Sequence, residues 1–327
     1  MYKRFYSLKK NPFEITPDPS FLFTTKGHNE ALATLYYGVR RRKGFVVLTG
    51  EVGTGKTLLI RSLLQILKLG DVHYAYVFNS RLAPTEFLQY IAGDFNLPIS
   101  AKTKSELLLQ LSSFVISRFK KGLTTVLVVD EAHHLPEEVL EEIRLLTNLE
   151  TAEEKLLQIL LVGQPELDEK LDSVNLRQLK QRIALRCQLS PLVLEETEGY
   201  IQRRLQVAGH ASANTLFPFE TVLEIQRHSR GIPRLINTLC ENALVNGYAK
   251  QATTISPEMI EDIALDFRLN IMRTPSLPEP IGESMKTVEE AAKTLLDLYA
   301  TLKAQSGGAA LREAVRNIGV RHNEPYI

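Results

Sequence analysis

The chain has 327 residues, of which 44% are hydrophobic and 24% are charged, values typical of a globular protein with a large apolar core. At about 100–200 residues per domain, this length predicts two domains and a tail. Lys plus Arg number 39 and Asp plus Glu number 38, so the net charge of +1 excludes binding to nucleic acid or acidic lipid through bulk charge alone.

The compartment is indicated by the cysteines and by the lengths of the apolar segments. Cys187 and Cys240 cannot build a disulfide framework and have no metal-ligand spacing, so we expect buried thiols. No apolar region follows the basic N-terminus, and the longest apolar runs are too short to span a bilayer. The sequence therefore predicts a cytoplasmic protein without a membrane anchor of its own.

The first forty residues begin with an extended segment and continue into a helix. Pro12, Pro17 and Pro19 favour an extended backbone, and apolar periodicity predicts a helix over 28–42. The helix ends in Arg40-Arg41-Arg42-Lys43-Gly44, where cations and glycine form an ordinary stop signal. A solvated helix end is favoured for these cations over a phosphate or DNA contact.

Strands alternate with helices between Phe45 and Leu189, which predicts an open parallel α/β sheet. The strands are expected at Phe45–Thr49, His73–Phe78, Thr125–Asp130, Gln158–Val162 and Ala184–Leu189. After Leu194 the pattern becomes helical, with helices expected at Leu194–Val207, Phe219–His228, Ile232–Ala249 and Pro257–Leu269. The last helix has Ser256 as its expected N-cap and Pro257 at its first position. These four helices predict a second, smaller domain.

The C-terminal segment 271–327 is expected to be a tail. Prolines in 273–282 indicate a linker, and apolar residues at steps of three and four over 284–304 predict an amphipathic helix. Packing of this helix on its own protein is favoured over docking onto a partner. The residues that follow it are expected to be mobile.

A complete P-loop pattern, GxxxxGK[ST], occupies residues 50–57 between a predicted strand and a predicted helix. Its residues are Gly50, Glu51, Val52, Gly53, Thr54, Gly55, Lys56 and Thr57. The glycines let backbone N–H groups surround phosphates at a helix N-terminus. Lys56 is expected to reach the β- and γ-phosphates of ATP, and the Thr57 hydroxyl to ligate Mg²⁺.

An acidic pair follows the apolar strand expected at Thr125–Asp130. Asp130 matches the Walker B position and is expected to hold Mg²⁺, and Glu131 is placed to activate water as the general base. The letters Asp-Glu-Ala-His match a helicase box, but companion helicase motifs are not found. His133 and His134 have no Cys or His partners at ligand spacing, which favours a structural or loop role over metal binding.

With these motifs the chain resembles an AAA+ ATPase, and more narrowly the ExeA (general secretion pathway protein A) family, over roughly residues 1–270. Beyond the P-loop and Val129-Asp130-Glu131-Ala132-His133, further segments carry the resemblance. They are Asn11-Pro12-Phe13, Thr16-Pro17-Asp18-Pro19, Phe21-Leu22-Phe23, His28, Tyr37-Gly38, Leu161-Val162-Gly163-Gln164-Pro165-Glu166-Leu167, Gln181-Arg182-Ile183 and Gly231-Ile232-Pro233-Arg234.

The resemblance implies roles that spacing alone does not assign. Gln164 would be the sensor-1 residue that helps to hold the attacking water. Arg182 would be an arginine finger that reaches a neighbouring subunit's site, with Arg177 as the reserve candidate. Arg234 would be sensor 2, contacting the γ-phosphate from its own subunit. Cations at the transferred phosphoryl group stabilise its transition-state charge, which agrees with these roles.

The resemblance also implies an architecture: a P-loop AAA+ parallel sheet flanked by helices over 1–193, an all-helical lid over 194–270, and the tail 271–327. It implies an ATPase that uses ATP and Mg²⁺, assembles into a homo-oligomeric ring or filament, and acts in secretion or envelope assembly. Relatives carry a transmembrane helix and a peptidoglycan-binding region after the ATPase. The segment 271–327 shows neither pattern, so an envelope partner would have to bind through 284–304.

Two other functions remain open from the sequence. TniB- and TnsC-type transposition ATPases are similar AAA+ proteins that assemble on DNA, and Arg40–Lys43 or the pair Arg203-Arg204 would then contact phosphates. The balanced net charge counts modestly against this reading. A nucleotide-dependent switch that turns over very slowly is the third reading, and an intact Glu131 argues against it.

Overall fold

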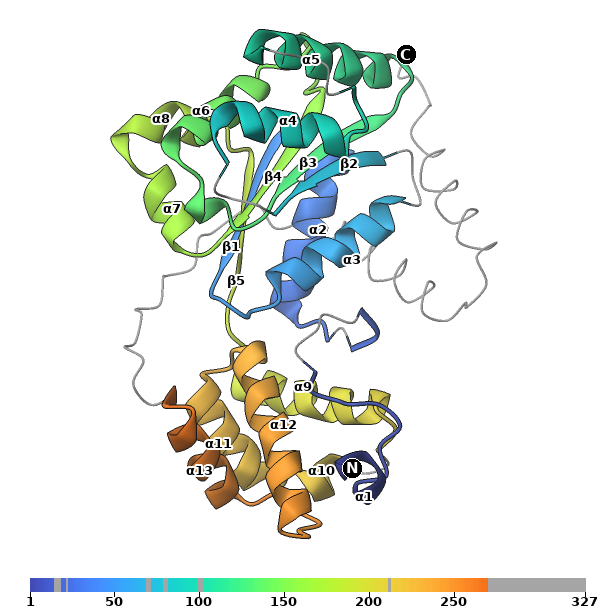
Figure 1. The fold of residues 1–327 in the computed structure, drawn as a ribbon, viewed down its shortest axis with the longest axis vertical. Helices are drawn as coiled ribbons and strands as arrows, with labels where there is room; N and C mark the ends of the chain where they lie inside the picture. Colours follow the sequence, from blue (N-terminus) through green and yellow to red (C-terminus); the bar gives the residue numbers. More distant parts are fainter. Residues whose placement is uncertain are drawn as a thin grey trace, which may run out of the picture. The chain divides into compact units, whose positions relative to one another are not determined.

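The structure is a computed structural model of the chain that describes residues 1–14, 19–21, 23–68, 72–78, 82–98, 103–210 and 213–269 (Figure 1). These residues divide into two units by their contacts. The sheet unit consists of the described residues of 28–50 and 59–188, and the helical unit consists of those of 1–27, 51–58 and 189–283. The predicted linker, amphipathic helix and tail of 271–327 lie outside the described residues, as do 15–18 and Leu22 of the proline-rich opening.

Five strands form one sheet in the order β2-β3-β4-β1-β5. They are β1 Phe45–Gly50, β2 Val72–Val77, β3 Thr124–Val129, β4 Leu157–Gly163 and β5 Leu185–Leu189. The pairs β1–β4, β4–β3 and β3–β2 are parallel, with Thr49 opposite Gly163 and Val129 opposite Leu161. The carboxyl ends of β1, β4 and β3 therefore meet at one edge of the sheet, where ligands of open parallel sheets bind.

Both faces of the central strands β1, β3 and β4 are buried, which explains why these three strands are largely apolar. One set of alternate residues packs into the core formed with the helices that follow β2, β3 and β4: Phe45, Val47, Ala75, Val77, Leu127, Val129, Ile159 and Leu161. The other set faces the opposite way, and Gly38 of α2 lies so close to Val46 that a Cβ there would be 2.7 Å from Val46 Cγ2. Figure 1 shows α2 and α3 on the side of the sheet opposite α4 and α5.

The helices around the sheet include several that periodicity did not single out. Their bounds are α2 Lys26–Arg40, α3 Lys56–Lys68, α4 Pro84–Asp94, α5 Lys104–Lys120, α6 Glu137–Leu146, α7 Glu166–Leu171 and α8 Arg177–Lys180. Two short 3₁₀ turns, η2 Ala132–His134 and η3 Val174–Leu176, complete the described elements of the sheet unit, and a third, η1 Pro19–Phe21, belongs to the helical unit. The α5 helix begins with a capping box, in which the Thr103 hydroxyl accepts from the Glu106 N–H.

The helical unit contains α1 Tyr2–Phe5, α9 Leu194–Val207, α10 Ala213–Leu216, α11 Phe219–Ser229, α12 Pro233–Ala249 and α13 Pro257–Asp266. Its apolar core also takes in the N-terminal segment, from which Tyr6 and Phe13 are buried against these helices. The rings of Phe13 and Phe217 meet edge to face with their centroids 5.9 Å apart. The extended opening is thus anchored by aromatic packing within this unit.

The predicted strands and the predicted parallel α/β class are confirmed, with every strand boundary within one residue of its expected place. Four details differ. The helix predicted over 28–42 begins and ends two residues earlier, the short α10 is added, and the last helix ends at Asp266. Ser256 stands at the N-cap position but makes no side-chain capping bond, because its hydroxyl pairs with Glu258. Among the described helices, none combines the length and the apolarity that a membrane crossing requires.

Candidate active site

The P-loop is a tight turn between a strand end and a helix start. β1 ends at Gly50 and α3 begins at Lys56, so Glu51–Gly55 forms the turn. The Glu51 carbonyl accepts three bonds within the loop, from Thr54 N at 3.3 Å, Thr54 Oγ1 at 2.8 Å and Lys56 Nζ at 2.9 Å. Thr54 and Lys56 are buried. The loop is therefore preformed at a helix N-terminus, the arrangement that binds phosphate.

Gly53 is a loop residue at which no side chain fits. Its φ of +82° lies in the left-handed region, and an added Cβ would lie 2.6 Å from Arg234 Cβ. The Arg234 N–H donates to the Gly53 carbonyl at 3.2 Å. Arg234 is the second residue of α12, so this bond satisfies one of the N–H groups that have no partner inside the helix. Within the helical unit, the loop and the start of α12 thus touch through backbone.

Asp130 follows β3 and is held on both carboxylate oxygens. Its Oδ2 accepts from the Tyr76 hydroxyl at 2.6 Å, and its Oδ1 accepts from the Glu131 N–H at 2.9 Å. Burial raises the pKa of Tyr76, and the Asp130 charge raises it further, so the phenol remains a proton donor to the carboxylate. Asp130 itself is only 5% exposed. Its orientation is therefore determined by β2 as well as by its own strand.

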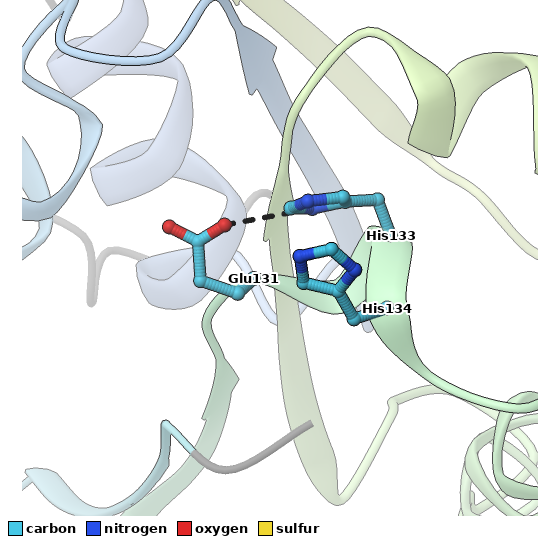
Figure 2. A group of neighbouring side chains, drawn as sticks. All are labelled: Glu131, His133 and His134. Carbon is cyan, nitrogen blue, oxygen red and sulfur yellow. Dashed lines mark ion pairs between the residues drawn. The ribbon is translucent and has the colours of Figure 1, made fainter. Parts of the chain in front are cut away.

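Glu131 adopts a left-handed backbone conformation, with φ 53° and ψ 35°. A non-glycine residue in this region is strained, and such strain is concentrated at functional sites. The His134 N–H donates to the Glu131 carbonyl at 3.0 Å, which begins the η2 turn. The Glu131 side chain is 44% exposed, and Figure 2 shows its carboxylate turned toward the ring of His133. The turn directs the general-base candidate away from the buried core.

Gln164 follows β4, the strand next to β3. Its Nε2 lies 3.4 Å from Glu131 Oε2, and its backbone N lies 3.4 Å from His133 Nδ1. An added Cβ on Gly163 would lie 2.7 Å from Leu167 Cδ2, so α7 packs closely against the strand end. Lys170 of α7 donates to the carbonyls of His133 and Leu135 and so binds η2 to α7. The structure therefore brings Asp130, Glu131 and Gln164 together at the edge of the sheet where β1 ends at Gly50.

The two arginine-finger candidates lie at the surface of the sheet unit. Arg182 is 39% exposed, and its Nη1 is 4.0 Å from Glu150 Oε1. Arg177 begins α8 and is also exposed. An exposed surface pair is weak and screened by water, so the Glu150 contact does not hold Arg182 in place. Either arginine is available to another molecule.

The residues expected to hold Mg²⁺ offer the donor atoms that this cation prefers. Magnesium takes hard oxygen ligands and keeps several of its waters. Asp130 supplies a buried carboxylate, and Thr57 supplies a hydroxyl in the first turn of α3. By its chemistry, each of these two groups is a donor of the kind that Mg²⁺ takes beside waters and phosphate oxygens.

Two of the basic residues considered for phosphate contact, Arg42 and Arg204, bind within the chain. Arg42 bonds Glu154 Oε2 at 2.7 Å and stacks on Phe119, which agrees with an ordinary helix end. Arg204 is 7% exposed and donates to the Pro12 carbonyl at 2.6 Å. The expectation that Arg204 could meet DNA phosphates is therefore wrong, because this guanidinium fastens the N-terminal segment to α9.

The two cysteines differ in burial, and two contacts of the site were not expected from the sequence. Cys240 is buried as expected, whereas Cys187 is only partly buried on β5; burial raises the pKa of Cys187 to about 12. Sequence reasoning missed Tyr76, whose only signal is an aromatic residue near the end of the strand beside β3. It also missed Glu131 as a third metal-ligating side chain near His133 and His134, since only Cys and His were considered.

Comparison with known proteins identifies the family. Residues 39–171 match the family model described as an AAA domain. Over 251 residues the chain is 44% identical to general secretion pathway protein A of Aeromonas hydrophila, which covers 76% of this chain and 45% of that protein. The chain thus spans less than half the length of this curated relative.

Solved structures agree on the fold. The Aeropyrum pernix ORC2 protein in its ADPNP-ADP complexes matches with a TM-score of 0.59 and 18% identity, covering 96% of this chain and 84% of that one. The Aeropyrum pernix ORC1 protein in complex with DNA matches with a TM-score of 0.60 and 18% identity, covering 79% and 69%. At this identity the likeness concerns the fold alone. Motifs, sequence identity and fold agree that the chain belongs to the AAA+ proteins and, among them, to the ExeA type represented by general secretion pathway protein A.

Proposed function

We propose that this chain is an ATPase that hydrolyses ATP to ADP and phosphate, with Mg²⁺ as its cofactor. The observation that carries the proposal is the grouping of Asp130, Glu131 and Gln164 at the sheet edge, with 3.4 Å between Gln164 Nε2 and Glu131 Oε2. A carboxylate and an amide that share one space can hold a single water between them. The P-loop departs from the same edge, because β1 ends there at Gly50.

Each residue has a distinct part in the proposed reaction. The P-loop N–H groups and Lys56 bind the β- and γ-phosphates, while Thr57 and Asp130 hold Mg²⁺. Glu131 accepts a proton from a water that Gln164 orients, and the water oxygen bonds to the γ-phosphorus as the bond to the bridging oxygen of ADP breaks. Mg²⁺, when bound, neutralises charge on the phosphate oxygens. Arg234 senses the γ-phosphate in the same subunit, and Arg182 of a neighbouring subunit stabilises the transition state.

Phosphate release and particle size, measured together on one sample, test this function. With MgATP we expect steady phosphate release and a homo-oligomer larger than the particle formed with ADP. Absence of hydrolysis under all these conditions, with ATP bound, would leave a nucleotide-dependent switch as the better description.

The cellular role proposed here is assembly or energising of a secretion or envelope apparatus. It is supported by the 44% identity to a protein named for the general secretion pathway. A DNA-dependent role in transposition is the alternative. Adding duplex DNA to the measurement of phosphate release and particle size tests it. Duplex DNA that stimulates hydrolysis in a salt-sensitive way would favour that role, and no effect at low salt would remove it.

Tyr76→Phe is expected to raise the Mg²⁺ concentration needed for half-maximal hydrolysis by about tenfold, because outer-shell partners of a metal-binding carboxylate have effects of this size. The phenol donates to Asp130 Oδ2 at 2.6 Å and so helps to orient that carboxylate. A Mg²⁺ titration of the ATPase rate measures the shift. Tyr74→Phe, two residues away on β2, is the matched control. An equal loss of rate at every Mg²⁺ concentration would contradict the positioning role.

Arg182→Ala is expected to lower hydrolysis by about 10³-fold, the effect of removing an arginine finger, while ATP binding is retained. A finger that acts in trans predicts rescue in mixtures. Lys56→Ala subunits keep Arg182, and Arg182→Ala subunits keep an intact nucleotide site. Mixing the two variants should therefore restore activity at interfaces where Arg182 of the first reaches the site of the second. Arg177→Ala is the paired variant, and a larger loss there than in Arg182→Ala would transfer the role to Arg177.

A further inference from the structure

The η2 turn gathers three metal-ligating side chains beside the active site. Glu131, His133 and His134 each offer one ligand atom, and these atoms lie within 4.8 Å of one another. Figure 2 shows the Glu131 carboxylate and the two imidazole rings converging on one space from a single turn of chain. The ATPase reaction assigns no task to His134, so this convergence needs a separate explanation.

The distance between Glu131 and His133 is close to that between two ligands of a tetrahedral ion. Ligand atoms about 2.1 Å from zinc in a tetrahedron are about 3.4 Å apart. Glu131 Oε2 and His133 Nδ1 are already 3.6 Å apart. The rings of His133 and His134 lie 3.9 Å apart between centroids, at 42° to each other. The three ligand atoms lie within 4.8 Å of one another, so the side chains must move closer together to bind one ion, with water as the fourth ligand. His133 Nδ1 must then exchange its 3.4 Å contact with the Gln164 N–H for the metal.

The backbone holds two of the ligands in place. Glu131 is fixed in its left-handed conformation, and its carbonyl accepts from the His134 N–H at 3.0 Å. Lys170 donates to the His133 carbonyl at 3.2 Å, and the His133 ring is 6% exposed. A cluster on a supported turn loses less freedom on binding a metal than one on a free loop.

We propose that Glu131, His133 and His134 form a regulatory site for an imidazole-binding divalent metal, Zn²⁺ in the first instance, and that its occupation inhibits the ATPase. Two imidazoles and one carboxylate select Zn²⁺ over Mg²⁺, which prefers oxygen ligands. A carboxylate that donates its lone pair to Zn²⁺ cannot take a proton from the attacking water. The inhibition rests on the proposed function, whereas the binding does not.

Binding is tested on the whole chain without nucleotide, using Co²⁺ as a spectroscopic probe and Zn²⁺ as its competitor. We expect a visible absorption typical of a tetrahedral Co²⁺ site that Zn²⁺ abolishes at one equivalent. His134→Ala is expected to weaken binding about tenfold or more, since it removes one of three protein ligands. His134 is exposed, so its replacement does not disturb the core. His210→Ala is the matched control and should bind like the parent.

Inhibition is measured as the ratio of rates with and without buffered free Zn²⁺ at a saturating, fixed MgATP concentration. The parent and His210→Ala should lose most of their activity over the Zn²⁺ range found for binding, and His134→Ala should need about tenfold more Zn²⁺. Equal inhibition of His134→Ala and the parent would overturn the proposal, because Zn²⁺ would then act elsewhere. Absence of tetrahedral Co²⁺ absorption would overturn the site itself. Metal binding without any ATPase activity in the parent would instead overturn the proposed function and leave the site standing.

Discussion

Glu131→Gln is expected to lower the rate of ATP hydrolysis by about 10²- to 10⁴-fold, the range for loss of a general base. Glutamine keeps the length and shape of the side chain but cannot accept the proton of the attacking water. The P-loop and Asp130 are unaltered, so ATP and Mg²⁺ should still bind. The variant should therefore trap ATP and stabilise the oligomer. Phosphate release under saturating MgATP, together with retained nucleotide and particle size, measures these effects.

The matched control is Glu138→Gln, which removes the same charge from an exposed position in the first turn of α6. It should hydrolyse ATP like the parent. If Glu131→Gln itself hydrolyses ATP at the parent rate, Glu131 is not the base. If the parent is as slow as the variant, the chain uses ATP as a switch, and the strained conformation of Glu131 needs another explanation.

The sheet could be predicted because its signals are local. Buried parallel strands are short β-branched runs, and the P-loop and the acidic pair mark where two of them end. These signals placed Gly50 and Asp130 at strand ends, as the structure has them to within one residue. The Val-Gly-Gln run likewise placed Gln164 after β4. Asp130 and Gln164 were both expected at strand ends, whereas their grouping depends on β3 and β4 being neighbours, which the order of the sheet shows.

Contacts that depend on register or burial could not be predicted. Tyr76 meets Asp130 because β2 pairs with β3 with Tyr76 opposite Val128, and no local pattern specifies that pairing. The left-handed conformation of Glu131 likewise has no signal in the local sequence. Arg204 looks like a surface cation in a charged helix, yet the extended N-terminal segment covers it. In each case a distant segment supplies the partner.

Lys56→Ala is expected to weaken ATP binding by about tenfold to a hundredfold and to lower hydrolysis further. A hydrogen bond between charged groups is worth about 1.5–3 kcal/mol, and the ammonium also stabilises charge that develops in the transition state. Lys56 Nζ is already positioned within the loop by the Glu51 carbonyl at 2.9 Å. Alanine favours helix at the first residue of α3, so the fold should be retained. Nucleotide titration by calorimetry and phosphate release measure the two effects separately.

Lys120→Ala, an exposed cation in the last turn of α5, is the matched control and should bind ATP like the parent. Lys56→Arg separates charge from geometry, because a guanidinium keeps the charge but does not fit a loop built around a compact ammonium. We expect it to bind ATP better than Lys56→Ala and to hydrolyse it poorly. Parent-like affinity in Lys56→Ala would mean that the backbone N–H groups bind the phosphates alone. The nucleotide site would then depend on the preformed loop, in which Gly53 is indispensable, more than on the lysine.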